Sequence, residues 1–151
     1  MPTETQKKPV RAKTDATNKK DRYIESIGRR KTAVARVRIY SVKAGKEIEA
    51  VVNDRPIAKY FPSKKFQDVA LAPFTALSLA EHRVTAKVVG GGTHAQAEAI
   101  RLGIARSLVT QNPLWRPRLK ALGFLKRDPR MVERKHPGTR KARRPQQWRK
   151  R

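Results

Sequence analysis

The carboxyl-terminal 36 residues, 116–151, restrict the possible folds of this chain more than any other feature. They hold 15 Lys or Arg residues against two acidic ones, and past Leu125 almost nothing apolar remains. Such a segment cannot bury enough surface to offset the entropy of ordering it, and its charges repel one another. A polyanion with a dense phosphate backbone would relieve that repulsion. We therefore expect a small globular body followed by an extended basic arm over residues 124–151.

The positive charge is spread unevenly along the 151 residues, whose formal net charge is +25. Residues 1–22 carry a net +4, residues 23–115 a net +8 and residues 116–151 a net +13. The chain has no cysteine, which excludes a disulfide framework and a thiolate metal site. No apolar run reaches the roughly 20 residues of a membrane helix. The start lacks a hydrophobic signal core, and its acidic residues argue against a transit peptide, so a cytoplasmic protein is expected.

Order is expected to begin near Tyr23. Residues 1–22 contain no aromatic residue and only Val10 as a large aliphatic one, so they are predicted to be a disordered basic extension. Alternating apolar and polar residues predict strands with one buried face. We expect strands over residues 23–27, interrupted at 28–31, then 32–40, a hairpin turn at 43–46 with a return strand over 47–52, and a strand over 82–89.

The remaining segments have helical patterns. Asp54 is expected to cap a short helix through Tyr60, and Thr93 with Gln96 matches the capping box of a longer one. That longer helix carries an apolar stripe. Asn112-Pro113 is expected to start a last helix, over 114–122, that stops at Gly123. The stripe is Ala97, Ile100, Ile104 and Leu108, and two further short helices are expected over residues 64–71 and 73–80.

Strands followed by helices on one face predict an α+β body over residues 23–123. Between a strand and a helix, Gly90-Gly91-Gly92 matches neither a Walker loop nor the G-x-G-x-x-G pattern. The three glycines either let an RNA backbone approach closely or form a tight turn that needs positive φ.

Five cations mark the second predicted strand and the residues before it: Arg29, Arg30, Lys31, Arg36 and Arg38. A charge run is usually a solvated face, but these lie nearly free of acids along the sequence. They favour a surface that follows phosphates, to which guanidinium groups are well suited.

The arm has its densest clusters at residues 140–144 and 149–151. Pro137-Gly138 and Pro145 disfavour a regular helix there. Trp148 has no core to join, so it is expected to stack on a base or ribose, the alternative being an exposed indole. The pair Lys150-Arg151 would make the most distal contact.

No pattern in the chain indicates catalysis or a metal. His82, His94 and His136 share no ligand spacing with a carboxylate, and no nucleophile–base set can be argued from spacing. We expect no enzymatic activity, no cofactor and no metal site.

With these residues in view, the chain strongly resembles the small-subunit ribosomal protein S-nine family, from about Tyr23 to Arg151. One motif is Gly28-Arg29-Arg30-Lys31-Thr32 with Ala35-Arg36-Val37. The most specific one runs from Gly90-Gly91-Gly92 through Ala95-Gln96 and Ala99-Ile100-Arg101 to Gly103-Ile104-Ala105-Arg106. The tail motif comprises Arg127-Asp128, Arg130, Val132-Glu133-Arg134-Lys135, Gly138, Lys141-Ala142-Arg143-Arg144 and Lys150-Arg151. The segment Gln146-Gln147-Trp148-Arg149 departs from the usual Pro-Gln-Phe-Ser.

The resemblance implies a sandwich like the second domain of ribosomal protein S-five, with a left-handed βαβ crossover that the general rule would not predict. It also implies a structural constituent of the head of the small ribosomal subunit, bound to the 3′ major domain of the rRNA beside other ribosomal proteins of the head. The arm would approach the anticodon stem-loop of peptidyl-site tRNA with Arg149, Lys150 and Arg151. The residues expected to contact rRNA are Arg29, Arg30, Lys31, Arg36, Arg38, Gly90, Gly91, Gly92, Arg127, Arg130, Arg134, Lys135, Arg140, Lys141, Arg143 and Arg144.

Two other functions fit the composition. The protein subunit of a tRNA-processing ribonucleoprotein would need an Arg-dense helix after the central strand, yet residues 96–108 hold only Arg101 and Arg106. A sequence-neutral DNA-binding protein should dimerise and bind duplex DNA as well as structured rRNA.

Overall fold

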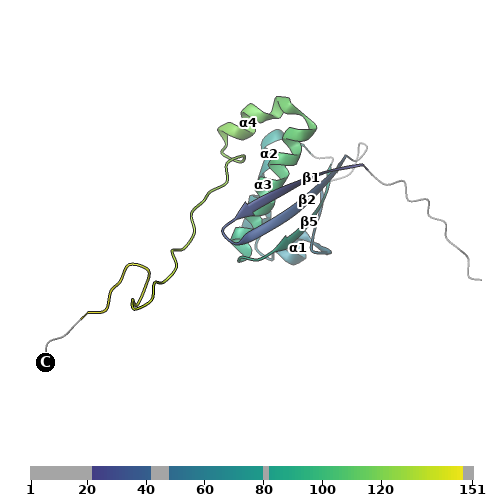
Figure 1. Ribbon diagram of the computed structural model, residues 1–151. Helices are drawn as coiled ribbons and strands as arrows, with labels where there is room; N and C mark the ends of the chain where they lie inside the picture. Colours follow the sequence, from purple (N-terminus) through teal and green to yellow (C-terminus); the bar gives the residue numbers. More distant parts are fainter. Residues whose placement is uncertain (1–21, 42–47, 80–81, 148–151) are drawn as a thin grey trace, which may run out of the picture.

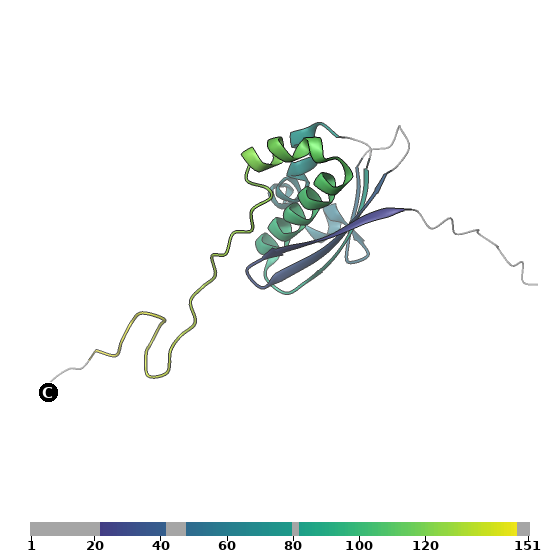
Figure 2. The same cartoon turned by 45° about the horizontal axis from the view of Figure 1, so that its top comes forward.

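The computed structural model describes residues 22–41, 48–79 and 82–147, and within them one sheet is packed against a layer of helices. Figure 1 shows the helices gathered on one face of the sheet, and Figure 2 shows the same two layers from another side. The prediction of an α+β body is confirmed. The strands are β1 (Tyr23–Arg30), β2 (Ala33–Ser41), β3 (Glu49–Val52), β4 (Arg55–Pro56) and β5 (His82–Val89), and the helices are α1 (Ile57–Tyr60), α2 (Lys64–Leu77), α3 (Thr93–Gln111), the 3₁₀ turn η1 (Pro113–Trp115) and α4 (Arg116–Ala121).

The strand order is β1-β2-β5-β3-β4, which corrects the predicted hairpin between residues 32–40 and 47–52. β2 pairs antiparallel with β1 and with β5, whereas β3 pairs parallel with β5. β5 pairs with β2 over eight residues, whereas β3 is only four residues long. The longer strand, β5, therefore lies next to β2. The turn residues at 43–46 carry no information about a pairing between strands so far apart in the sequence. The predicted turn at 43–46 lies outside the described residues.

A hairpin joins β1 to β2, and its turn is Lys31-Thr32, where Lys31 has φ 51°. The predicted break at residues 28–31 is therefore wrong at its start, because β1 continues through Gly28 to Arg30. Gly28 lies in the strand because α3 crosses directly above it. A Cβ there would collide with the carbonyl oxygen of Ala99 and lie 2.6 Å from the nitrogen of Gly103.

The predicted alternation of the strands is confirmed. Ala33, Ala35 and Val37 of β2 are fully buried, and Val84, Ala86 and Val88 of β5 are almost so. All four residues of the predicted stripe on α3 are buried in the core. Small residues, among them Gly28, Ala99 and Gly103, form the contact between α3 and the first two strands, so α3 lies close to β1 and β2. The opposite face of the sheet has no helix on it in either view of the described chain (Figures 1 and 2).

Three helix predictions need correction. Asp54 does not cap a helix; it has φ 63° in the turn between β3 and β4, and α1 follows Pro56. The two predicted helices over 64–71 and 73–80 are one helix, α2, that runs through Pro73. Pro73 lacks the N–H that would bond one turn back, but it is buried beside Ala70 and Phe74, and this packing offsets the lost bond.

The third correction concerns the start of α3. Thr93 is the first helical residue and Gly92 the cap, without a side-chain hydrogen bond, so the capping box is wrong. Farther along, Asn112 caps η1 as predicted, because its Oδ1 accepts from the Leu114 N–H at 3.0 Å. α4 then ends at Ala121, two residues before Gly123.

No helix of the described residues is long and apolar enough to cross a membrane. Residues 1–21 and 148–151 lie outside the described part, so the predicted extension falls there except for Arg22.

Candidate nucleic-acid interface

Two turns that sequence motifs single out lie against each other at one end of the sheet. Gly90 and Gly91 have φ values of 75° and 67°, which other residues rarely adopt. A Cβ on Gly90 would lie 2.6 Å from the Thr32 carbonyl oxygen, and one on Gly91 would lie 2.8 Å from the Cβ of Ala33. The first two glycines thus let the turn after β5 pack on the β1–β2 turn. Around Gly92 nothing lies within 4 Å of an added Cβ.

Polar side chains hold this glycine turn in place. The Nε2 of Gln96 donates to the Gly90 carbonyl at 3.1 Å, and the hydroxyl of Tyr60 donates to the Oε1 of Gln96 at 2.9 Å. Asn53 bonds both backbone groups of Val88 with its side chain, at 2.8 and 3.0 Å. Gln96, predicted to belong to the capping box of α3, therefore fixes the glycine turn before that helix.

Arg30 joins the body to the start of the carboxyl-terminal segment. Its Nε contacts the Oε2 of Glu98 on α3 at 2.5 Å, and its Nη2 lies 3.0 Å from the Oδ2 of Asp128. Its Nη1 donates to the Arg130 carbonyl at 2.8 Å. Only 13% of the side chain is exposed. Because its donors are bonded inside the protein, this guanidinium acts in the described structure as a clasp between β1, α3 and residues 128–130.

Asp128 also bonds the backbone, which favours its ionised form. Its Oδ1 accepts the backbone N–H of Arg130 at 2.9 Å. That bond, helped by the charge of Arg30, holds the pKa of the Asp128 carboxyl below its ordinary value of 3.8. The carboxylate therefore keeps its charge to lower pH than a free aspartate would, and its bond to Arg130 fixes the local backbone.

A hollow of about 540 Å³ opens beside the clasp, between β1, α3 and the chain from Gly123 to Arg130. Arg101 lies at its edge with its guanidinium 5.3 Å from the ring centre of Phe124. Glu98 and Asp128 are the acids of the lining, and both already contact Arg30. The net positive lining suits a phosphate group. Its cations are Arg29, Arg30, Arg101, Lys126, Arg127 and Arg130.

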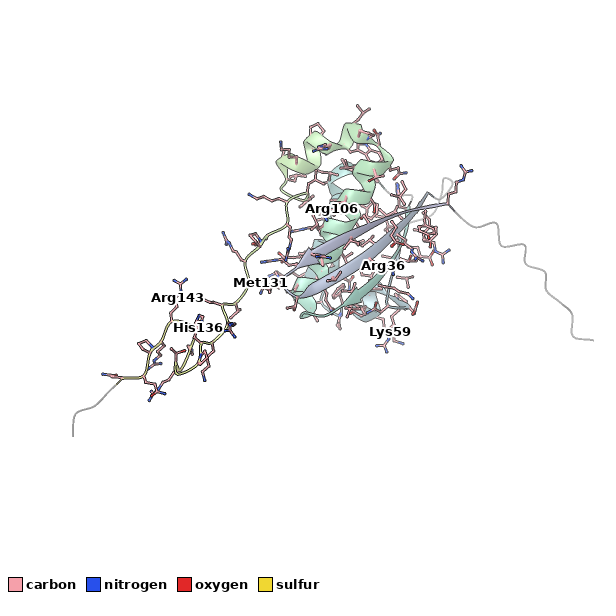
Figure 3. All side chains as sticks on the ribbon, in the orientation of Figure 1. Arg36, Lys59, Arg106, Met131, His136 and Arg143 are labelled. Carbon is pink, nitrogen blue, oxygen red and sulfur yellow. The ribbon has the colours of Figure 1, made fainter. Side chains whose placement is uncertain are left out.

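The cations of β2 are less free than the sequence suggests. Arg36 and Arg38 project from the open face of the sheet, as Figure 3 shows for Arg36. Both donate to Glu25 of β1, Arg38 with its Nε at 2.7 Å and Arg36 with its Nη2 at 2.9 Å. These hydrogen bonds, that of Arg38 foremost, hold the pKa of Glu25 below its ordinary value of 4.5. The premise that the five cations lie free of acids is therefore wrong for Arg30, Arg36 and Arg38.

Residues 126–147 form no helix or strand beyond an isolated bridge between Lys141 and Arg144. This segment extends away from the sheet and helices (Figure 1). Figure 3 shows Arg143 and His136 on side chains that lie well away from the sheet. All nine Lys and Arg residues of this stretch are exposed: Lys126, Arg127, Arg130, Arg134, Lys135, Arg140, Lys141, Arg143 and Arg144.

A small loop presents the cluster at residues 140–144. The Arg140 N–H donates to the Arg144 carbonyl at 2.9 Å, and Arg143 contacts Glu133 at 2.8 Å. The four cations of this loop are exposed. The predicted contacts of Trp148, Arg149, Lys150 and Arg151 lie outside the described residues.

Sequence patterns missed several members of this surface. Glu98, Asp128 and Glu25 are isolated acids whose partners lie far away in the sequence. Arg83 and Lys87 alternate outward on β5, and this period of two was a signal that could have added them to the site. Among the described residues no group of three or more His, Asp or Glu side chains is placed to hold a metal.

A basic α+β domain joined to an exposed cationic segment defines a class of polyanion-binding proteins. Residues 28–151 match the family described as "Ribosomal protein S9/S16".

The relatives agree with this match. A protein of Porphyromonas gingivalis named "Small ribosomal subunit protein uS9" is 48% identical over 130 residues, which are 85% of this chain and 98% of the relative. The protein of the same name from Nocardia farcinica is 44% identical over 132 residues, 87% of this chain and 77% of the relative. "Small ribosomal subunit protein uS9m" of Kluyveromyces marxianus is 47% identical over 127 residues, 83% of this chain and 42% of the relative. The chain belongs to the ribosomal protein S9 family, whose members are structural proteins and not enzymes.

Proposed function

We propose that this protein is a structural constituent of the small ribosomal subunit, that it binds the 3′ major domain of the rRNA in the subunit head, and that its tip approaches peptidyl-site tRNA. The nine exposed cations of residues 126–147, on a segment without a core, carry the proposal. Family membership and the names of the relatives support the small subunit as the place. The arm would take a fixed path as counterions leave the rRNA.

The parts of the body have different roles in this proposal. Arg29 and Lys31 are exposed beside the glycine turn and would contact phosphates directly. Arg36 and Arg38 would do so from the open face. Arg30 would contribute mainly by fixing where the arm leaves the body, since its donors are bonded to Glu98, Asp128 and Arg130.

The finer fold is proposed on the same grounds. β3 and β5 are parallel neighbours, and α1 and α2 lie between them in the chain. This is a βαβ unit, and we assign it the left-handed crossover of the family. The two cations of α3 argue against a tRNA-processing subunit, because Arg101 lies on Phe124 and Arg106 donates to the Ile27 carbonyl at 2.7 Å.

A competition experiment tests the rRNA part. The full chain is bound to a fragment of the 3′ major domain and challenged with tRNA or duplex DNA at two salt concentrations. We expect the rRNA fragment to keep the protein at the higher salt, since fitted contacts persist while unspecific ones weaken. Equal displacement by duplex DNA would favour the DNA-binding alternative, and displacement by tRNA alone would favour the processing alternative.

Peptidyl-site tRNA dissociation from reconstituted subunits tests the tip. We expect deletion of Lys150 and Arg151 to leave assembly intact and to speed dissociation. The matched control replaces Lys64 and Lys65, two exposed cations at the start of α2, by Gln. An unchanged rate in the deletion variant, or an equal rise in the control, would remove the tRNA contact from the proposal.

A further inference from the structure

The open face of the sheet joins two cations already predicted from the sequence, Arg36 and Arg38, to aromatic residues that the sequence motifs do not mark. Tyr23 of β1 lies opposite Tyr40 of β2, and Tyr40 lies opposite Arg83 of β5. In the next outward row Arg38 lies between Glu25 and Thr85. Arg36 and Lys87 are paired in the row after that. Aromatic rings thus occupy one end of this face, and cations continue from them.

The rings and guanidinium groups lie close to one another on this face. The ring centres of Tyr23 and Tyr40 are 5.6 Å apart with planes inclined by 53°. The guanidinium carbon of Arg38 lies 4.8 Å from the centre of the Tyr23 ring, and that of Arg83 lies 5.7 Å from the Tyr40 ring. Flat π-surfaces of both kinds can stack on an unpaired base.

Carboxylates hold these guanidinium groups without covering them. Glu25 accepts from Arg38 at 2.7 Å, and Glu49 lies 3.5 Å from Arg83. The side chains of Arg38 and Arg83 are nevertheless 38% and 46% exposed. Less rotamer entropy is lost when groups that are already fixed bind a ligand.

A role in the core does not account for this arrangement. The core lies on the other side of the sheet, under α2 and α3, and Tyr23 is 47% exposed. A cross-strand tyrosine pair would help to hold the edge of the sheet. It does not require two arginines over the rings. Arg38, which lies over the Tyr23 ring, also lines a hollow of about 200 Å³. The other residues of its lining are Arg36, Val51, Asp54, Thr85, Ala86 and Lys87.

We infer that the open face binds an unpaired stretch of RNA, with a base against Tyr23 and Tyr40 and the adjoining phosphates in the hollow near Arg36 and Lys87. The inference rests on the proposed rRNA function and specifies the strand state that this face takes. A duplex keeps its bases stacked inside, so it offers nothing to the rings. Exposed aromatics on a sheet are an established way to hold unpaired bases.

Binding of the full chain to a ten-nucleotide RNA tests the inference, with the RNA used alone and as a blunt duplex at two KCl concentrations. Tyr23→Ala with Tyr40→Ala should weaken binding of the unpaired RNA about tenfold, because stacking on each aromatic ring contributes appreciably. The factor should be the same at both salt concentrations, since stacking releases no counterions. Duplex binding, and the control Leu114→Ala at an 83% exposed site on η1, should not change.

Two further measurements keep the inference falsifiable if the alanine variant is poorly folded. Tyr23→Phe with Tyr40→Phe keeps the rings and should bind like the original chain. A 4-thiouridine in the unpaired RNA should cross-link to peptides that contain Tyr23 or Tyr40 in the unmodified protein.

Several outcomes would overturn it: unpaired RNA binding within twofold of the original in the alanine variant, an equal loss for duplex, or cross-links confined to the arm. Polyglutamate serves as a second probe. If the alanine variant loses affinity for polyglutamate but not for unpaired RNA, the open face binds an acidic protein and the inference is wrong. Binding of the rRNA fragment is measured in parallel. If the fragment binds and the tyrosine variants have no effect, only this inference fails, whereas no fragment binding would remove the proposed function itself.

Discussion

The body and the arm are both basic, yet different forces determine their conformations. In the body, α3 lies against β1 and β2 through buried alanines and through Gly28, so the shape depends on close approach of the backbones. Residues 131–147 have no such contact surface, and Val132 is 90% exposed. The body is specified by packing, whereas we propose that the path of residues 126–151 on RNA depends on the number and spacing of their charges. A substitution should therefore affect one region through volume and the other through charge.

Removal of residues 126–151 should give the largest effect. This segment holds 12 Lys or Arg residues. Their loss should weaken binding to the rRNA fragment about a thousandfold and flatten its salt dependence, because fewer counterions are released. The free energy of unfolding of the body should change by about 1 kcal/mol or less, since the arm buries little against it. Filter binding over a KCl series and thermal unfolding measure the two quantities, and an unfolded body would contradict the comparison.

Substitution of Gly28 by Ala should have the opposite pattern. The new methyl group would meet the Ala99 carbonyl, so β1 or α3 must move, and we expect a loss of about 3 kcal/mol of stability. Below the melting temperature the rRNA affinity should stay within about twofold, because the charges of the arm are unchanged.

The matched control is Gly92→Ala. The Cβ at Gly92 would have open space, and its φ of −98° is accessible to alanine, so this change should cost about 1 kcal/mol or less. Similar losses for both glycines in a denaturant titration would show that close approach of α3 does not limit the stability of the body.

The difference between the regions also explains what could be predicted from the sequence. The alternation of β2 and β5 and the stripe on α3 were predictable, because local periodicity records which face is buried. The position of β5 between β2 and β3, the passage of α2 through Pro73 and the contact of Gly28 with α3 depend on partners distant in sequence. In the site, the exposed cations of the arm followed from composition, whereas the ion pairs of Arg30 and Glu25 required the fold.

Arg30→Gln tests the clasp where the two regions meet. It removes the contacts with Glu98 and Asp128, and both carboxylates lose their shared cation. We expect a loss of about 1–2 kcal/mol of stability and faster trypsin cleavage after Lys126 and Arg127. The exposed neighbour Arg29→Gln is the control, which should lower rRNA affinity without changing cleavage. Identical cleavage rates in both variants would mean that Arg30 does not hold the start of the arm.

Glu25→Gln should give the smallest effect and the sharpest separation of packing from charge. The folded pKa of Glu25 lies below 4.5 because Arg38, and then Arg36, donate to it. Its contribution to stability is therefore present above about pH 4.5 and is lost as the pH falls through the folded pKa. The melting temperature of the variant should be about 2 °C lower at pH 7 and equal to that of the original chain at the acid end of a pH series.

The same substitution should raise RNA affinity while it lowers stability. Without Glu25 the open face loses a negative charge beside Arg36 and Arg38. We expect this gain in positive potential to outweigh the loss of their fixed geometry, so the affinity of the open face at pH 7 should rise about twofold. The comparison variant is Glu49→Gln, on the same face beside Arg83. It should also raise the RNA affinity, but it leaves the hydrogen bonds between Arg36 and Glu25 in place. A fall in both quantities would show that Glu25 positions the two arginines for RNA, and that the open face, like the body, depends on geometry more than on charge.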